Sequence, residues 1–259
     1  MSSLLEVRDL RAEFPTHQGV VHAIRGVSLT VSEGEVVGVV GESGSGKTVF
    51  LRSLLGLVPS PGRIVGGEIR FDGSDLLKAT AEKMRRLRGG EIALIPQDPV
   101  NAFNPALTVG FQLVRALKLR RKTPPELGWN REAEMILKKV GIESEDALKR
   151  HPFRFSQGQL QRCMTAMAVL TGRPRLLLAD EPTTSLDVTI GAQILWLISQ
   201  LQREMGLAVI LVTHDLGVIA RLSDRIMVMR DGAVVESGTK PHPVVGHQCC
   251  VRARDETCT

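Results

Sequence analysis

An octapeptide near the start of the chain has the composition of a phosphate-binding loop. It reads Gly41-Glu42-Ser43-Gly44-Ser45-Gly46-Lys47-Thr48 and follows the apolar run at 36–40. In the spacing Gly-x-x-x-x-Gly-Lys-Thr, the glycines let phosphates approach backbone N–H groups, and the next helix presents its positive end. We expect Lys47 to reach the outer phosphates of a nucleoside triphosphate and the Thr48 hydroxyl to ligate Mg²⁺. The alternative is a glycine-rich turn that binds nothing, which would not require this lysine and threonine.

Two adjacent carboxylates follow a second apolar run. The run Leu176-Leu177-Leu178-Ala179 predicts a buried central strand, and Asp180 and Glu181 stand at its end, where open parallel sheets bind ligands. Because side chains alternate along a strand, the two carboxylates cannot point the same way. We expect Asp180 to hold Mg²⁺ through its water shell and Glu181 to face an attacking water as general base. The alternative is a polar strand end before an ordinary helix start at Asp-Glu-Pro.

A third segment, Phe155-Ser156-Gln157-Gly158-Gln159, combines a helix cap with a possible anion site. Ser156 and Gln159 have the Ser-x-x-Gln spacing of a capping box, and the apolar residues at 160–170 predict the helix behind it. A cap explains the serine and the second glutamine. It explains neither the glycine nor a helix start directed outward with free N–H groups. A chain with two phosphate-binding helix starts predicts a dimer.

Together these segments resemble the nucleotide-binding subunits of ATP-binding cassette (ABC) transporters over about residues 4–238. The resemblance is carried by GESGSGKT at 41–48, Ile95-Pro96-Gln97-Asp98-Pro99 with Asn104-Pro105, FSQGQLQR at 155–162, LLLADEPT at 176–183, Ser185-Leu186-Asp187 and Val212-Thr213-His214-Asp215-Leu216. The strings DEPTTSLDVTIGAQIL at 180–195 and VTHDLGVIA at 212–220 are similar to the branch that imports peptides or nickel. The resemblance implies an α/β fold of the P-loop NTPase class, with a RecA-like parallel core, a flanking antiparallel β subdomain and a helical subdomain.

The resemblance also implies roles for single residues. Gln97 would sense the γ-phosphate and Mg²⁺, and His214 would hold the γ-phosphate and the attacking water. Ser156 and Gly158 would contact ATP held by an opposing subunit, and Asp187 would link the two sites. The residues assigned to nucleotide binding are Gly41, Glu42, Ser43, Gly44, Ser45, Gly46, Lys47, Thr48, Ser156, Gly158, Gln159 and Asp187; those assigned to catalysis are Glu181, His214 and Gln97; those assigned to the metal are Thr48, Gln97 and Asp180. As alternatives, Gln97 is a turn residue and His214 a strand-end histidine.

The implied function is that of an ATPase subunit that energises a multi-subunit importer of peptides or nickel-type ligands, with ATP and Mg²⁺ as cofactors. The implied partners are a second ABC ATPase subunit, two transmembrane permease subunits and an extracytoplasmic substrate-binding protein. The implied location is peripheral, at the cytoplasmic face of the inner membrane. A nucleotide-gated binding module with weak hydrolysis is the alternative. A soluble ABC ATPase acting on DNA or ribosomes would need a coiled-coil insertion or two cassettes, which 259 residues do not accommodate.

The sequence departs from the family pattern in three places. Gln157 replaces the first of two adjacent glycines, and we expect only Gly158 to need close phosphate approach. The chain has no tyrosine to stack on adenine, so Phe14 and His17 are both candidates. The tail at 241–259 lacks helical or strand periodicity. Its candidate metal ligands are His242, His247, Cys249, Cys250 and Cys258, whose spacing matches no familiar zinc or iron-sulfur motif.

The periodicity of the remaining chain indicates how these motifs are positioned. Alternating residues at 4–35 and 66–73 predict an antiparallel sheet, and 36–60, 91–97 and 174–220 predict the parallel core. The segment at 101–170 is predicted to be helical, and a further helix is predicted after Asp187. The buried stripes of these helices are Ala133, Ile136, Leu137 and Val140 in the first, and Ile190, Ile194, Leu197, Ile198 and Leu201 in the second. Asp231-Gly232 predicts a hairpin turn. We therefore expect one ATPase domain at 1–240, with the helical subdomain inside it.

Composition agrees with an enzyme domain that needs no disulfides. The chain is 43% hydrophobic, which is enough for a substantial core, and three of its four cysteines crowd at the C-terminus. No apolar run approaches the roughly 20 residues that span a bilayer, so we expect a partner to supply any membrane association. The net charge of +5 includes a basic cluster at Arg115, Lys118, Arg120, Arg121 and Lys122. Because no aromatic side chains are interleaved there, we expect a solvated face and no nucleic-acid partner.

Overall fold

Short apolar runs along the chain form a six-stranded sheet in the computed structural model, which describes residues 3–121, 123–144, 146–184 and 186–239. The strand order is β10-β9-β3-β8-β7-β6. The strands are β3 (Val36–Val40), β6 (Ile92–Ile95), β7 (Leu176–Asp180), β8 (Ala208–Val212), β9 (Arg225–Arg230) and β10 (Ala233–Thr239). Only β10 is antiparallel to its neighbour. Every residue of β3, β7 and β8 is buried, as expected for parallel strands covered on both faces.

A second, antiparallel sheet covers one flank of this core. It has the order β2-β1-β4-β5 and comprises β1 (Ser3–Thr16), β2 (Gly19–Ser32), β4 (Arg63–Phe71) and β5 (Ser74–Asp75). One apolar cluster joins both sheets, because Val27 and Phe71 from the second sheet share it with Val37 and Ile210 from the first. Phe50 of helix α1 (Lys47–Leu54) is completely buried in the same cluster, and burying such a side chain stabilises the fold by about 1.5–3 kcal/mol. The predicted antiparallel flank is therefore confirmed.

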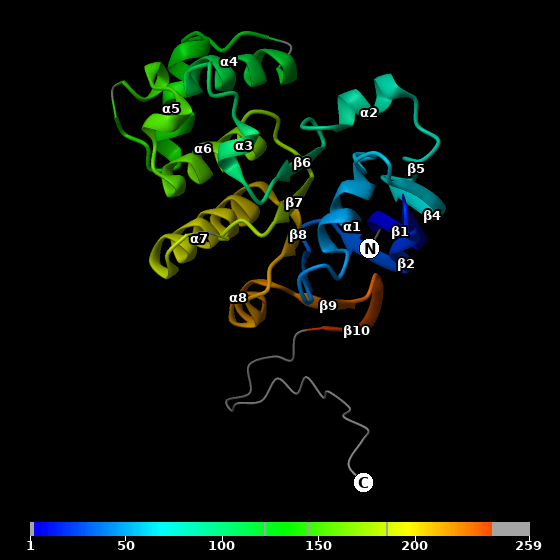
Figure 1. The fold of residues 1–259 in the computed structure, drawn as a ribbon. Helices are drawn as coiled ribbons and strands as arrows, with labels where there is room; N and C mark the ends of the chain where they lie inside the picture. Colours follow the sequence, from blue (N-terminus) through cyan, green and yellow to red (C-terminus); the bar gives the residue numbers. More distant parts are fainter. Residues whose placement is uncertain (1–2, 122, 145, 185, 240–259) are drawn as a thin grey trace.

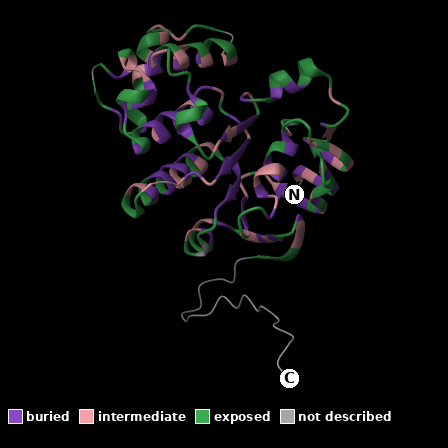
Figure 2. Ribbon diagram, viewed as in Figure 1, coloured by how far each residue is buried: buried purple, intermediate pink, exposed green. Residues whose placement is uncertain are grey.

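The helices at 99–169 gather on the side of the six-stranded sheet that lies away from the antiparallel sheet (Figure 1). The helices other than α1 are α2 (Ala81–Leu87), α3 (Pro99–Ala102), α4 (Val109–Arg120), α5 (Trp129–Lys139), α6 (Gln157–Val169), α7 (Val188–Met205) and α8 (Leu216–Leu222), with 3-10 turns at Ala147–Lys149 and Pro152–Arg154. A second apolar cluster runs from α4 and α5 through α6 to β6, β7 and α7 without a break. Figure 2 shows the sheet residues buried inside these layers.

Both predicted apolar stripes are found where the periodicity placed them. Ala133, Ile136, Leu137 and Val140 are buried, and on α7 Ile194, Leu197, Ile198 and Leu201 are buried while Ile190 is half-buried. The predicted hairpin joins β9 to β10 through Asp231 and Gly232, whose φ angles of +49° and +79° suit a tight two-residue turn. No helix of the described residues is long and apolar enough to span a bilayer.

Two of the five basic residues expected to form a solvated face are instead part of the packing. The Arg120 guanidinium donates to Met167 O (2.7 Å) and to the Thr171 hydroxyl, and burial lowers its pKa. Arg121 pairs with Glu132 at 2.6 Å. Both therefore tie α4 to neighbouring helices, and the expectation is wrong for them. Arg115 and Lys118 are exposed as expected, and Lys122 lies outside the described residues.

Candidate functional site

The loop between β3 and α1 has a backbone that only glycine accommodates at two positions. Gly44 and Gly46 adopt φ angles of +82° and +97°, which side chains with a Cβ rarely adopt. A Cβ on Gly46 would lie 2.5 Å from Ala23 O, whereas one on Gly44 would meet nothing within 4 Å. Gly46 is thus required by packing against β2. Gly44 leaves the outer side of the loop open for a ligand.

The loop is held from behind by the hairpin of β9 and β10. The Gly232 N–H donates to Ser45 O at 3.1 Å, and a Cβ on Gly41 would lie 2.2 Å from Met229 O. The Ser45 hydroxyl is buried and has no hydrogen-bond partner within the described parts of the chain. No side chain of the described residues caps α1 at its N-terminus, so the first N–H groups of the helix are available to a ligand. These features suit a loop that wraps an anion.

Lys47 lies inside the loop, with its side chain almost fully buried. Its ammonium donates to Gly41 O and Glu42 O, both at 2.8 Å. An ammonium has three N–H donors, so one remains for a phosphate. The buried charge has no carboxylate partner among the ion pairs of the described residues. A phosphate oxygen would supply the missing negative charge.

The next pair, Thr48 and Asp180, joins the loop to the end of β7. The Thr48 hydroxyl donates to Asp180 Oδ1 at 3.1 Å, although the two residues are 132 positions apart. Asp180 is only 4% exposed, and this burial raises the pKa of its carboxyl, while the hydrogen bond from Thr48 opposes the rise. A cation beside this carboxylate would stabilise its charged form. Hydroxyl and carboxylate oxygens are ligands that suit Mg²⁺, so these residues fit the metal.

Glu181 follows directly and turns away from Asp180 for a reason other than strand alternation. Strand β7 ends at Asp180, and Glu181 has a left-handed φ of +44°, a strained conformation for a residue with a side chain. Two backbone bonds hold it there: Glu181 N–H donates to Val212 O at 2.9 Å, and Thr184 N–H donates to Glu181 O at 3.1 Å. The predicted divergence of the two carboxylates is therefore found, but a tight turn produces it.

Three side chains converge on one oxygen of the Glu181 carboxylate. Thr184 Oγ1 donates to Oε2 at 2.8 Å, Gln97 Nε2 donates to it at 3.3 Å, and His214 Nδ1 lies 3.5 Å from it. Gln97 comes from the end of β6 and His214 from the end of β8, on either side of β7. The sheet order thus places both beside the predicted base. None of the hydrogen bonds found in the described chain joins Gln97 to Thr48 or Asp180.

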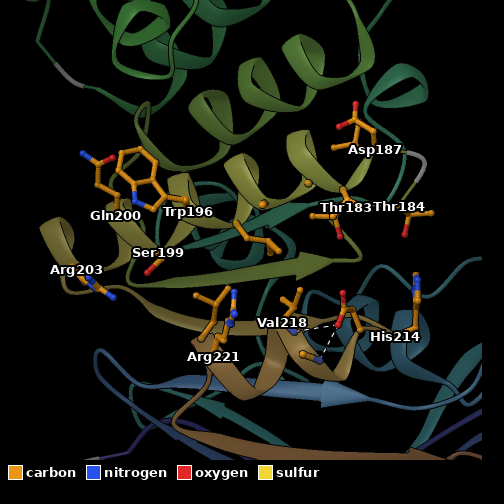
Figure 3. A pocket seen from close by; sticks show the side chains of 18 of the residues that line it. Thr183, Thr184, Asp187, Trp196, Ser199, Gln200, Arg203, His214, Val218 and Arg221 are labelled. Atoms are coloured by element: carbon orange, nitrogen blue, oxygen red, sulfur yellow. Dashed lines mark hydrogen bonds between the residues drawn. The ribbon is translucent and has the colours of Figure 1, made fainter.

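Sequence reasoning missed Thr184. Its contact with Glu181 depends on the left-handed turn at that residue, which the sequence does not indicate. Thr184, His214 and Asp187 also stand at one end of a groove of about 1120 Å³ between α7 and α8 (Figure 3). The Glu181 site therefore borders an open surface of the protein.

The predicted capping box is confirmed at the start of α6. Gln159 N–H donates to Ser156 Oγ at 3.3 Å, and Ser156 N–H donates to Gln159 Oε1 at 3.1 Å. Ser156 is exposed, yet no hydrogen bond or ion pair of the described residues joins this segment to the loop at 41–48. In the described part of one copy, the two helix starts thus share no direct polar contact.

The packing of the chain requires glycine at position 158, which the sequence did not reveal. A Cβ at this position would lie 2.6 Å from Ile190 Cγ2 on α7. The glycine is therefore needed for packing within the chain, and its contact with a phosphate stays a prediction. Gln157 is exposed beside it, so its side chain meets no such restriction.

This packing predicts a specific loss of stability in Gly158→Ala. Forcing a methyl group against Ile190 should lower the free energy of unfolding by about 1–3 kcal/mol, because overpacking displaces side chains and backbone. Urea unfolding followed by circular dichroism measures the change. The exposed neighbour Gln157→Ala is the matched control and should stay within about 0.5 kcal/mol. Adding Ile190→Ala to Gly158→Ala should recover part of the loss, and no recovery would contradict the packing explanation.

The remaining candidate residues have structural contacts of their own. Asp187 is the N-cap of α7 and accepts a hydrogen bond from Ile190 N–H at 2.9 Å. Phe14 packs against Gly62, where an added Cβ would lie 2.3 Å from its ring, and His17 is exposed in the turn between β1 and β2. Neither contact identifies the residue that stacks on adenine. The candidate metal ligands of the tail lie outside the described residues.

The profile of the family described as ABC transporter matches residues 24–184. The dipeptide transport ATP-binding protein DppD of Bacillus subtilis (strain 168) is 45% identical over 242 residues, which cover 93% of this chain and 72% of DppD. The oligopeptide transport ATP-binding protein OppD of the same organism is 45% identical over 241 residues, which cover 92% of this chain and 67% of OppD.

Solved structures agree with this assignment. A dimeric ATP-binding cassette, MJ0796, solved in a post-hydrolysis state with ADP and Pi, superposes with a TM-score of 0.81 at 27% identity, covering 92% of this chain and 99% of that chain. The cbiO1 protein of Clostridium perfringens, part of the ABC transporter complex cbiONQ, superposes with a TM-score of 0.75 at 26% identity, covering 93% of this chain and 90% of cbiO1. The family profile spans more than half of the chain, and the matched stretch contains both the loop at 41–48 and Glu181. This chain therefore belongs to the ABC transporter family.

Proposed function

We propose that this chain binds and hydrolyses ATP as the energising subunit of an importer for peptides. The observation that carries the proposal is the meeting of Lys47, the Thr48–Asp180 pair and the Glu181 cluster at the carboxyl edge of one parallel sheet. The first supplies positive charge, the second oxygen ligands and the third a carboxylate held by neighbouring side chains. The choice of peptides over other cargo is supported by the relatives, which are dipeptide and oligopeptide transport proteins.

In the reaction, a water oxygen forms a bond to the γ-phosphorus of ATP. The bond from that phosphorus to the β–γ bridging oxygen breaks, and its electron pair leaves with ADP. Glu181 takes a proton from the water, and the water oxygen becomes one of the oxygens of the released phosphate. Lys47 and the N–H groups of the loop offset the negative charge of the phosphates. The protein thus contributes mainly position and charge.

Mg²⁺ belongs to the proposal through the residues that would hold it. Thr48 and Asp180 would hold the ion, Asp180 through water, and Gln97 is a third candidate ligand. When bound, the metal neutralises charge on the phosphate oxygens. In this structure the Gln97 Nε2 donates to the Glu181 carboxylate, and its amide oxygen is the atom that would ligate the metal.

The proposal includes a second ABC ATPase subunit that completes each ATP site. Ser156, the Gly158 backbone and Gln159 stand at a helix start whose N–H groups suit an anion, and no hydrogen bond of the described residues joins them to the loop at 41–48 of their own chain. The dimeric neighbour MJ0796, solved with ADP and Pi, supports such a pairing. Asp187 and His214 would then lie near both subunits. Two transmembrane permeases and an extracytoplasmic substrate-binding protein complete the importer, with this chain peripheral at the cytoplasmic face of the membrane.

A concentration series tests the composite site. If two subunits complete each other, the ATPase activity per molecule should rise with protein concentration and level off as dimers form. Sedimentation velocity with a non-cleavable ATP analogue would show the dimer directly. If the active form pairs this chain with a different subunit, the rise appears on titrating that subunit. An activity per molecule that is constant from nanomolar to micromolar protein, with and without the partner subunit, would contradict the proposal.

The alternative function is a nucleotide-gated module with little hydrolysis, which Gln157 in place of a glycine would favour if it impaired the site. Gln157 is exposed at the helix start and is not restricted by packing within its own chain. Purified protein that closes on ATP but releases no phosphate, even with its partner subunit, would favour the module.

A further inference from the structure

The two oxygens of the Glu181 carboxylate have unequal surroundings. Oε2 receives the hydrogen bonds from Thr184 and Gln97 and lies beside His214 Nδ1. For Oε1, the hydrogen bonds and ion pairs of the described chain include no partner. A carboxylate bound through one oxygen has a defined plane, and its other oxygen can accept a proton.

The three side chains at Glu181 Oε2 differ in how freely each can move away from this oxygen. Gln97 is 84 residues away in the sequence and exposed, and the His214 side chain is 68% exposed. Both come from strand ends that face the proposed nucleotide, and both have proposed contacts with phosphate or metal. They can leave Oε2 when ATP binds without disturbing the turn that holds Glu181.

Thr184 has no such freedom, because it shares a turn with Glu181. Its N–H donates to Glu181 O at 3.1 Å, and its hydroxyl donates to Oε2 at 2.8 Å, the shortest of the three contacts. The residue is half-buried, and Pro182 stiffens the turn between the two. The left-handed φ of Glu181 fixes the direction in which its side chain leaves the backbone. Thr184 therefore moves with Glu181.

We propose that Thr184 is a positioning residue for ATP hydrolysis, whose hydroxyl holds Glu181 Oε2 so that Oε1 faces the attacking water. This inference rests on the proposed role of Glu181 as general base. In the step concerned, Oε1 accepts a proton from the water as the water oxygen bonds to the γ-phosphorus and ADP departs with the bridging oxygen. Thr184 itself touches neither water nor phosphate. It limits rotation of the carboxylate, and small errors in such geometry are costly in rate.

The expected kinetic signature follows from this indirect role. Thr184→Val keeps the branched shape and removes only the hydroxyl, so packing in the turn is preserved. We expect its kcat to fall about 10-fold, with KM for ATP unchanged within about 2-fold, because ATP binding does not depend on the orientation of the base. Thr184→Ser restores the hydroxyl and should recover most of kcat. Steady-state phosphate release at varied ATP, in the dimeric or partner-bound protein, measures both constants.

A neighbouring threonine provides the matched control. Thr183 lies in the same turn and also lines the groove (Figure 3), but its hydroxyl makes no hydrogen bond within the described residues. Thr183→Val removes an equivalent atom one residue away and should leave kcat within about 2-fold. Equal losses in Thr183→Val and Thr184→Val would assign the effect to the turn and overturn the proposal.

Other outcomes separate this inference from the function on which it rests. If Glu181→Gln abolishes turnover while Thr184→Val is fully active, Thr184 does not position the base, but Glu181 keeps its role. If Glu181→Gln is itself fully active, the base is wrongly assigned and the inference fails with it. A loss in Thr184→Val that Thr184→Ser does not recover, or that appears in KM alone, would also overturn the proposal.

Discussion

Glu181→Gln is expected to lower ATP turnover by about 100- to 1000-fold while ATP binding is retained. The amide has the shape of the carboxylate and can still accept the hydrogen bond from Thr184, but it cannot take a proton from water. General-base catalysis typically contributes 10²- to 10⁴-fold, which sets the scale of the loss. Phosphate release at saturating ATP is the measurement. Because hydrolysis would reopen the dimer, the variant should also accumulate as an ATP-bound dimer in size-exclusion chromatography.

The control for Glu181→Gln is a glutamate far from the sheet edge. Glu126 lies exposed in the connection between α4 and α5 and makes no ion pair within the described residues. Glu126→Gln changes the net charge by the same amount and should leave turnover unchanged. If Glu181→Gln released phosphate at the rate of the parent protein, Glu181 would not be the base.

Lys47→Ala is expected to weaken ATP binding by about 100-fold. The substitution removes a buried positive charge and the two hydrogen bonds to Gly41 O and Glu42 O, and it leaves an outer phosphate without its cation. A hydrogen bond to a charged group contributes about 1.5–3 kcal/mol, and about 2.7 kcal/mol corresponds to a 100-fold change in affinity. Titration with a fluorescent ATP analogue measures the affinity directly. The increase in melting temperature that ATP produces in the parent protein should disappear as well.

A surface lysine separates this effect from a simple loss of charge. Lys78 pairs with Asp75 on the surface, and its side chain is 84% exposed. Lys78→Ala should bind ATP as the parent protein does, since surface ion pairs contribute little. Circular dichroism without nucleotide would show whether Lys47→Ala keeps its fold. A folded Lys47→Ala protein with unchanged affinity would mean that the loop at 41–48 does not bind the triphosphate.

The local elements of this protein could be predicted because their signals act over a few residues. The buried strands at 36–40 and 176–180, the capping box of Ser156 and Gln159, and the turn at Asp231-Gly232 depend on neighbours no more than four positions away. The structure confirms them all. The antiparallel flank and the α/β class follow from the same periodicities.

Other features depend on contacts that form only in the folded chain, and residue types and spacing do not indicate them. Gly158 is required because Ile190 packs against it from α7, and Arg120 and Arg121 became helix tethers because Met167 and Glu132 lie beside them. Thr184 was within three residues of Glu181, yet its contact depends on the left-handed turn that follows β7. Neither residue type nor spacing alone specifies which side chains lie next to these residues in the folded protein.

By itself, the sequence determined that this chain carries a phosphate-binding loop, a paired carboxylate after a buried strand and a capped second helix start. Only the tertiary structure decided that Gln97 and His214 reach the same oxygen of the Glu181 carboxylate, and that the Thr48 hydroxyl donates to Asp180. Gln97 and Glu181 are 84 residues apart in the sequence, and Thr48 and Asp180 are 132 residues apart. They meet because β6 and β8 flank β7, and β3 lies next to β8. Parallel strands place their carboxyl ends on one edge whatever their distance along the chain, so strand order determines which residues form the site.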